Sequence, residues 1–157
     1  METNELASRY PDSPHTVQPG NEFQDLVCTE LGKRGIVFSN FVSKKYQLTV
    51  GENIQGFEIK LDNRFPDTRQ LSIEIAEKSA RDRPNWTPSG IYKQDNTWLY
   101  IQGCSSGFYI FAKSLLLLLH KDKKKNYKEY EHNGTIKKFH LPLSDADKYC
   151  ALYVPIS

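Results

Sequence analysis

Apolar residues recur along this chain with two different periods, one typical of a helix and one typical of strands. Near the start, Phe23, Leu26, Val27 and Leu31 fall on one face at helical spacing, which predicts a helix over residues 22–33. Further on, apolar and polar residues alternate in several short runs, and this alternation predicts half-buried strands. Helices and strands are therefore both expected in one chain.

The predicted elements follow one another without an internal repeat. After the first helix, the pattern predicts strands over 36–38, 45–50, 55–62 and 71–76, a hairpin of residues 97–102 and 108–112, a helix over 112–121, a strand over 139–143 and a helical turn over 144–149. Prolines and small polar residues near the start predict an irregular arm over residues 1–19, followed by a single domain over 20–157. We expect an α+β (mixed α/β) fold.

The strand predicted over residues 55–62 has an unusual polar face. Because successive side chains of a strand point in opposite directions, Glu58, Lys60 and Asp62 share one face, and the apolar residues between them share the other. Glu52 has the same parity if the extended conformation reaches back to it. Carboxylates that converge with an ammonium group are suited to holding a divalent cation beside a polarised water.

Composition narrows the class of protein only slightly. Of the 157 residues, 38% are hydrophobic and 25% are charged, and the net charge of +2 neither requires nor excludes a nucleic-acid partner. The three cysteines are widely spaced and form no Cys-x-x-Cys motif, which predicts reduced thiols in a cytoplasmic protein. The apolar run over residues 115–119 is too short to span a membrane, and we expect neither a signal peptide nor a membrane partner.

The segment around the polar strand resembles the PD-(D/E)xK nuclease superfamily, whose members are restriction-endonuclease-like. Glu58 and Lys60 match the acidic-x-Lys motif, Glu52 takes the place of the preceding acid, and Gly56 lets the backbone come close before the motif. The likeness covers roughly residues 20–78 and is shared with small bacterial and phage proteins. It implies an N-terminal helix packed on a central mixed β-sheet, together with a second helix.

The resemblance also implies an activity, that of a magnesium-dependent deoxyribonuclease. Glu52 and Glu58 would hold Mg²⁺ (or Mn²⁺) through oxygen ligands, and Lys60 would position the attacking water or stabilise charge on the phosphate. Polar side chains on neighbouring elements would support these groups, and the candidates are Gln47, Asp62 and Glu74.

Two features depart from the family pattern. The first acid is Glu52 rather than aspartate, and it lies close to Glu58 in the sequence. The family often adds a glutamate from the first helix, and here Glu22 and Glu30 compete for that role. A carboxylate within an apolar face is costly unless it is paired or bound to a metal, which favours Glu30. Glu22, at the expected helix start, would also interact favourably with the helix dipole, so the choice stays open.

Cations outside the motif would contact the DNA. The stretch over residues 121–138 has seven lysines against three acids, and Tyr127 and Tyr130 lie between them, where their rings could stack on bases. The lysines expected to bind nucleic acid are Lys44, Lys45, Lys123, Lys124 and Lys125. Since a nuclease with one site often pairs with a second copy to cut both strands, a homodimer is also an expectation.

Two other interpretations stay open. A nuclease-fold protein that binds nucleic acid or regulates without cutting would keep the same core, and the glutamate at position 52 leaves room for it. A β-rich interaction module would use Glu58 and Lys60 only as a salt-bridged face. Convergence of Glu52 and Glu58 near Lys60 would separate the nuclease core from the interaction module.

Overall fold

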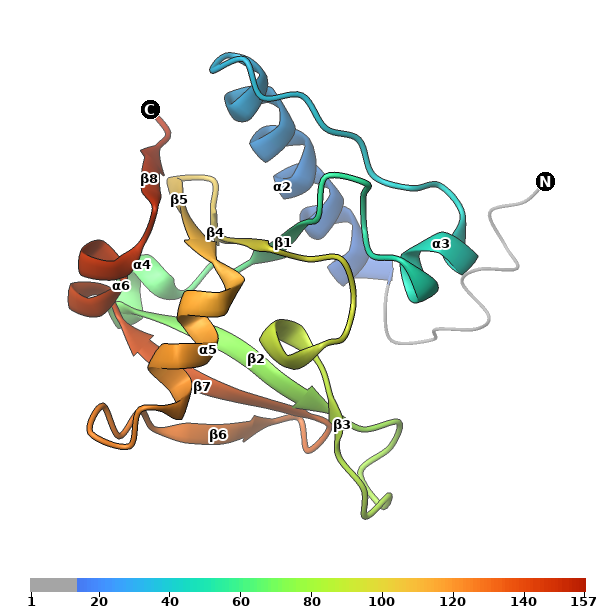
Figure 1. Cartoon of the computed structure of the whole chain (residues 1–157), viewed down its shortest axis with the longest axis vertical. Helices are drawn as coiled ribbons and strands as arrows, with labels where there is room; N and C mark the ends of the chain where they lie inside the picture. The colour runs from blue at the N-terminus through green and yellow to red at the C-terminus, as the bar shows by residue number, and fades with distance from the viewer. Residues whose placement is uncertain (1–13) are drawn as a thin grey trace. The chain divides into compact units, whose positions relative to one another are not determined.

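The computed structural model describes residues 14–157 (Figure 1). The chain divides into two compact units, Met1–Val37 and Phe38–Ser157. Most of the arm predicted over residues 1–19 lies outside the described residues, and the part from Pro14 onward belongs to a helix.

The described part of the first unit is built around one helix. This helix, α2, spans Pro14–Gly32 and includes the helix predicted from the apolar spacing. The side chains of Phe23, Val27 and Leu31 are buried, as their common face predicted.

The second unit contains two four-stranded sheets, of which the first is mixed. Its strand order is β1-β4-β5-β8; β1 pairs with β4 in parallel, and the other neighbours are antiparallel. Its strands are β1 (Phe57–Leu61), β4 (Leu99–Cys104), β5 (Gly107–Ala112) and β8 (Leu152–Pro155). The strand that carries the predicted motif, β1, therefore lies at an edge of this sheet.

The second sheet is antiparallel throughout, with the order β3-β2-β7-β6. Its strands are β2 (Gln70–Glu77), β3 (Thr87–Pro88), β6 (Glu129–His132) and β7 (Ile136–Pro142). The helices of this unit are α3 (Lys44–Thr49), α4 (Phe65–Thr68), α5 (Lys113–Lys121) and α6 (Leu143–Tyr149), with a 3₁₀ turn, η1, at Gly90–Tyr92. The fold is thus α+β, as predicted.

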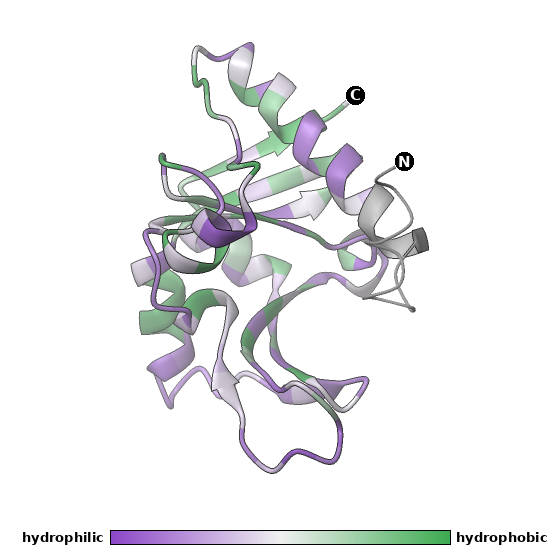
Figure 2. Ribbon diagram, turned by 90° about the vertical axis from the view of Figure 1, so that its right-hand side faces the viewer, coloured by the Kyte–Doolittle hydropathy of each residue, from purple (hydrophilic) through white to green (hydrophobic). Residues whose placement is uncertain are grey.

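Alternation along β2 and β7 separates the hydrophobic core from a polar face. Leu71 and Ile73 of β2 pair with Leu141 and Phe139 of β7, and all four side chains are fully buried. The residues between them are only partly buried, which is the pattern of a sheet with one face on a core. Hydrophobic and hydrophilic residues alternate visibly along the strands in Figure 2. The core also takes in aromatic residues of the first sheet and apolar residues of α5 and α6.

Two predicted strands are wrong. Residues 36–38 have no regular structure, and residues 45–50 largely form α3, a helix with no buried residue. In this segment Leu48 is 75% exposed, so the alternation of apolar and polar residues does not reflect a buried face. A six-residue run is too short for its period to decide between a strand and a helix when tertiary burial does not select one face. The sequence pattern also missed β3, β6 and β8.

Two further expectations concern the membrane and the cysteines. Within the described residues, no helix is long and apolar enough to cross a membrane, and the apolar run over residues 115–119 lies inside α5. Cys28, Cys104 and Cys150 are all free thiols, and only Cys104 is fully buried.

Candidate active site

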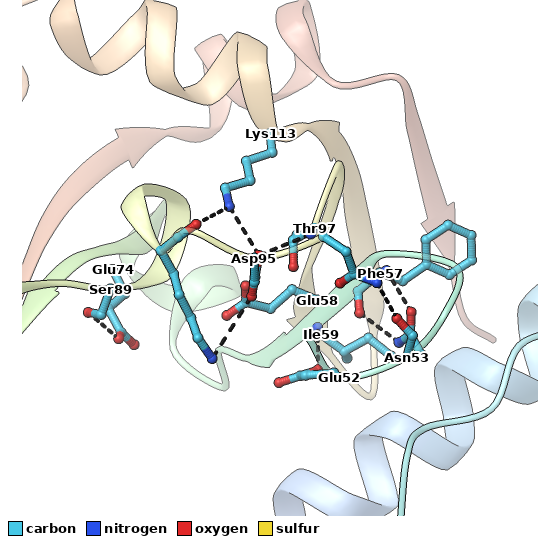
Figure 3. A network of polar contacts seen from close by, with 12 residues as sticks. Glu52, Asn53, Phe57, Glu58, Ile59, Glu74, Ser89, Asp95, Thr97 and Lys113 are labelled. Carbon is cyan, nitrogen blue, oxygen red and sulfur yellow. Dashed lines mark hydrogen bonds and ion pairs between the residues drawn. The ribbon is translucent and has the colours of Figure 1, made fainter. Parts of the chain in front are cut away.

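A buried asparagine holds the segment that leads into β1. Asn53 is fully buried; its amide nitrogen donates to the carbonyl of Phe57 at 2.7 Å, and its amide oxygen accepts from the Phe57 N–H at 2.8 Å. Gly56 has a φ of +76°, and a Cβ there would lie 2.5 Å from the carbonyl oxygen of Asn96. Only glycine fits this turn without strain. The turn brings Glu52 back beside β1 (Figure 3).

Alternation along β1 places Glu58 and Lys60 on one face, as predicted. Glu58 is 4% exposed, and its Oε1 lies 3.1 Å from the Lys60 Nζ. On β2, alternation directs Glu74 to the same place, where its Oε2 lies 4.0 Å from the same nitrogen. One ammonium group therefore lies between carboxylates from two different sheets.

The second oxygen of Glu58 lacks a partner. Glu58 Oε2 is buried and accepts no hydrogen bond from any described residue. A buried carboxylate oxygen without a donor is costly, and a bound cation is one way to lower that cost. A positively charged ligand at this oxygen would offset that cost.

Glu52 is close enough to interact with both groups. Its Oε2 accepts a long hydrogen bond, 3.4 Å, from the Ile59 N–H at the outer edge of β1. Burial raises the pKa of the Glu52 carboxyl; the charge of Glu58 adds to this, and the charge of Lys60 opposes it. The two carboxylates thus repel each other beside Lys60.

The lysine and a neighbouring tyrosine both keep their protons at neutral pH. Burial acts to lower the pKa of Lys60, but the carboxylates, Glu58 foremost, outweigh it and hold that pKa well above its ordinary value. Tyr100 stands opposite Glu58 in the β1–β4 pairing and is fully buried. Burial and the nearby carboxylates raise its pKa far above the usual range, and its hydroxyl has no partner among the described residues. The site thus has two protonated groups next to its acids.

Glu74 is fixed by the loop that follows β2. Its Oε1 accepts a hydrogen bond from the Ser89 Oγ at 2.7 Å, and Ser89 is buried. The next residue, Gly90, has a φ of +54°, and a Cβ there would lie 2.1 Å from the Glu74 carbonyl oxygen. Close backbone packing therefore requires glycine at this position and holds the serine against the carboxylate.

A second polar network lies beside Glu52 and is shown in Figure 3. Lys113 is 8% exposed and donates to the Lys93 carbonyl at 2.6 Å and to Asp95 Oδ1 at 3.4 Å. Asp95 also accepts from the Thr97 N–H at 3.0 Å. The charge of Lys93 acts on Glu52 and favours its ionised form.

Asp62 connects three strands and is not free to serve a metal. Its Oδ2 accepts from the Ser72 N–H and from the Gln102 Nε2, both at 2.9 Å, and Gln102 also donates to the Ser72 carbonyl at 2.9 Å. These bonds join the end of β1 to β2 and β4. The sequence predicted that Asp62 supports the site. In the structure it does so indirectly, by linking the two sheets that carry Glu58, Lys60 and Glu74.

A polar pocket of about 470 Å³ opens next to this link. Lys60 and Glu74 lie in its wall, and Tyr100 and Gln102 line it from β4. Its volume is within the usual range for ligand sites, about 300–1,000 Å³. The motif thus borders a space that can hold a ligand.

The other predicted site residues lie on helices, Gln47 on α3 of this unit and the two glutamates on α2 of the first unit. Gln47 lies on α3, and its side chain donates to the Phe41 carbonyl. On α2, Glu22 is exposed, whereas Glu30 pairs with Lys33 at 2.7 Å and with Arg34 at 3.2 Å. A role for either glutamate in the site stays a prediction.

The predicted nucleic-acid lysines differ in their surroundings. Lys44 and Lys45 are exposed on α3, and Lys123 and Lys124 are exposed in the turn after α5. Lys125 is engaged within the protein: its Nζ donates to the Tyr149 hydroxyl at 3.1 Å and lies 3.7 Å from Asp145. Lys125 is therefore less free to meet a phosphate than its neighbours.

The residues present fit a divalent cation held by few protein ligands. The described chain contains no group of three or more His, Cys, Asp or Glu side chains arranged to hold a metal. Mg²⁺ commonly uses only one or two carboxylates, with waters and substrate phosphate completing its shell. Glu58, with its unpaired Oε2, and the neighbouring Glu52 are the residues that would hold it.

No protein-family model, curated protein or solved structure matches this chain. We therefore infer function from the site itself.

Sequence reasoning missed Tyr100 and Gln102 and gave Ser89 no definite role. Tyr100 and Gln102 alternate along β4 with buried apolar residues, so one face of this strand is recognisably polar. That they lie beside Glu58 and Lys60 follows only from the parallel pairing of β1 with β4, which no local pattern reveals. Ser89 reaches Glu74 through a loop whose path is equally non-local.

Proposed function

We propose that this protein is a metal-dependent endonuclease that hydrolyses phosphodiester bonds in DNA. The observation that carries the proposal is the buried Glu58 carboxylate, which is paired with Lys60 through one oxygen and has no partner at the other. Glu52 lies beside it, and a polar pocket begins at Lys60. The mixed sheet that carries β1 supports a restriction-endonuclease-like core.

The chain's own groups divide the work as follows. When bound at Glu52 and Glu58, Mg²⁺ or Mn²⁺ supplies charge neutralisation at the phosphate and a more acidic water. Lys60 acts as a fixed cation and not as a general base, because its raised pKa keeps it protonated at neutral pH. It orients the water or stabilises the negative charge that develops on the phosphate. Tyr100, also protonated, keeps a hydroxyl donor next to Glu58.

The pKa of Glu52 gives the proposed activity a pH dependence. Because burial raises this pKa, Glu52 stays protonated to a higher pH than an ordinary glutamate. A protonated carboxyl is a poor metal ligand. We therefore expect cleavage at a fixed metal concentration to rise with pH as Glu52 ionises, and more metal to compensate for the loss at low pH.

A plasmid cleavage assay tests the proposal. Wild-type protein is incubated with supercoiled DNA and Mg²⁺ or Mn²⁺, in parallel with Glu58→Gln and Lys60→Met. The wild type should nick or degrade the DNA, EDTA should stop it, and both variants should lose most of the activity. The matched controls are Glu131→Gln and Lys148→Met, which change exposed residues away from the pocket wall.

The outcomes separate this proposal from the non-catalytic alternative. If the wild type binds DNA in a gel-shift assay but never cleaves it with either metal, the protein is a nuclease-fold binding protein. If it neither binds nor cleaves, the Glu58–Lys60 pair is a salt-bridged face of an interaction module. Equal cleavage by wild type and both variants would place the activity at another site.

A further inference from the structure

The pocket beside Lys60 has a wall built by strand alternation. Ser72 and Glu74 of β2 stand opposite His140 and Lys138 of β7, and Tyr130 of β6 stands opposite Lys138. All of these residues line the pocket. They occupy the positions that alternate with the buried core residues of the same strands. Because the alternate residues of these strands are buried in the core, the residues between them are directed to the pocket on the opposite face of the sheet.

Positive charge in this pocket is in excess. Its two acids are already engaged: Glu74 by Ser89 and Lys60, and Asp62 by three N–H donors. Arg64 and Lys138 also line the pocket, and neither forms a salt bridge with any described residue. Two cations without a protein counter-ion in a concave polar site favour an anionic ligand.

The pocket also offers a surface for a planar ring. The rings of Tyr130 and His140 are stacked, with centroids 4.3 Å apart and an interplanar angle of 17°. Both line the pocket, at the sheet face that carries Lys138. Aromatic side chains of this kind are stacking platforms for nucleobases.

Three residues that line the pocket have unused hydrogen-bonding capacity. Gln102 is 2% exposed; both hydrogen bonds of its side chain come from the amide nitrogen, and its Oε1 has no partner among the described residues. The Tyr100 hydroxyl and the His140 Nδ1 are likewise buried and unpartnered. Buried polar atoms without partners cost free energy, so these groups leave hydrogen-bonding capacity unused next to the pocket.

We propose that this pocket binds one nucleotide of the substrate strand next to the cleaved bond. Its base lies against Tyr130 and His140, and its phosphate lies between Arg64 and Lys138. The inference rests on the proposed nuclease function, because Lys60 belongs both to the pocket wall and to the motif. In this arrangement the base of the bound nucleotide leaves the stack of DNA bases. Unstacking costs a few kcal/mol in a duplex and less in single-stranded DNA.

The experiment measures binding without metal or catalysis. A fluorescent single-stranded octanucleotide is bound to the protein in EDTA, and dAMP, dGMP, dCMP, dTMP and inorganic phosphate are added separately as competitors. We expect at least one mononucleotide to displace the octanucleotide at a concentration at least tenfold lower than phosphate. Lys138→Ala and Arg64→Ala should each weaken mononucleotide binding about tenfold, as expected for the loss of one charge-assisted contact.

The matched control is Lys137→Ala. Lys137 is the preceding residue on the same strand, does not line the pocket, and lies with its Nζ over the Trp86 ring, 4.6 Å from the centroid. The variant removes the same charge from the same strand and should leave mononucleotide binding unchanged. Circular dichroism and thermal melting of all three variants verify that they fold.

The inference is overturned if Lys137→Ala weakens binding as much as Lys138→Ala, because a general charge effect then explains the result. It is also overturned if phosphate competes as well as every mononucleotide, or if mononucleotides bind without displacing the octanucleotide. None of these outcomes affects cleavage at Glu58 and Lys60, which is measured separately. Conversely, a protein that cannot cleave DNA can still pass this binding test.

Discussion

Replacing Lys60 by methionine removes the only cation that forms an ion pair with Glu58 among the described residues. Methionine keeps much of the aliphatic stem, so the change is chiefly one of charge. Glu58 then has neither oxygen paired, because its Oε2 already lacks a partner. Removing one partner of a buried ion pair typically costs about 3–5 kcal/mol. The Lys60 side chain is 34% exposed, and solvent screening lowers our expectation to about 2–3 kcal/mol.

Urea unfolding followed by circular dichroism, at pH 7 in EDTA, measures this loss. The double variant Glu58→Gln/Lys60→Met removes the stranded charge as well, and we expect it to recover to within about 1 kcal/mol of the wild type. The control, Lys124→Met, should change the free energy of unfolding by less than about 0.5 kcal/mol. A double variant no more stable than Lys60→Met would refute the reasoning, since the cost would then not arise from Glu58.

Three other outcomes follow from the structure. Gln102→Leu breaks the link to Asp62 and should destabilise the protein by about 2–4 kcal/mol, against little change for the exposed control Gln94→Leu, both measured by urea unfolding. Glu52→Gln should be more stable than the wild type in metal-free buffer at pH 8 and equal to it near pH 4. Glu52 has a raised pKa in the folded state, so its ionisation as the pH rises lowers the stability of the wild type. Thermal melting between pH 4 and pH 8 measures the stability difference between the variant and the wild type, and a difference that grew toward low pH would contradict this expectation. Gly56→Ala should cost at least about 1 kcal/mol, because it puts a Cβ on a residue with positive φ and against the Asn96 carbonyl; Gly20→Ala, in an open helical position, should stabilise by about 0.5–1 kcal/mol.

The parts of the fold that the sequence predicts are those whose period reflects burial. The helix around Phe23 and Val27 and the strand around Ile73 each bury one face, so the apolar spacing identifies them. The hairpin of β4 and β5 is buried on both faces, and its connection, rich in glycine and serine, identifies it. The strand expected over residues 45–50 fails because its apolar residues are exposed and nothing in the tertiary structure selects a face. The three missed strands, β3, β6 and β8, are short, and pairing with a neighbouring strand determines their conformation more than their own composition does.

The candidate site likewise has one part that the sequence predicts and another part that only the tertiary structure reveals. Glu58 and Lys60 share a face by parity alone, and the alternation of β2 directs Glu74 to its polar side. The meeting of Glu74 with Lys60 depends on how two sheets face each other, and the position of Tyr100 depends on a parallel pairing. Neither is encoded in any short segment. The unpaired Oε2 of Glu58, on which the proposed metal ligation depends, is visible only once all neighbours are in place.

The most direct test of the central claim is the initial rate of plasmid nicking by Glu58→Gln relative to the wild type at saturating Mg²⁺. This variant keeps the side-chain shape and removes the charge that the metal would need, so the protein should remain folded. The account predicts a rate at least about 100-fold lower, the size expected when one group that stabilises the transition state is lost. A folded Glu58→Gln protein that nicks DNA as fast as the wild type would contradict it.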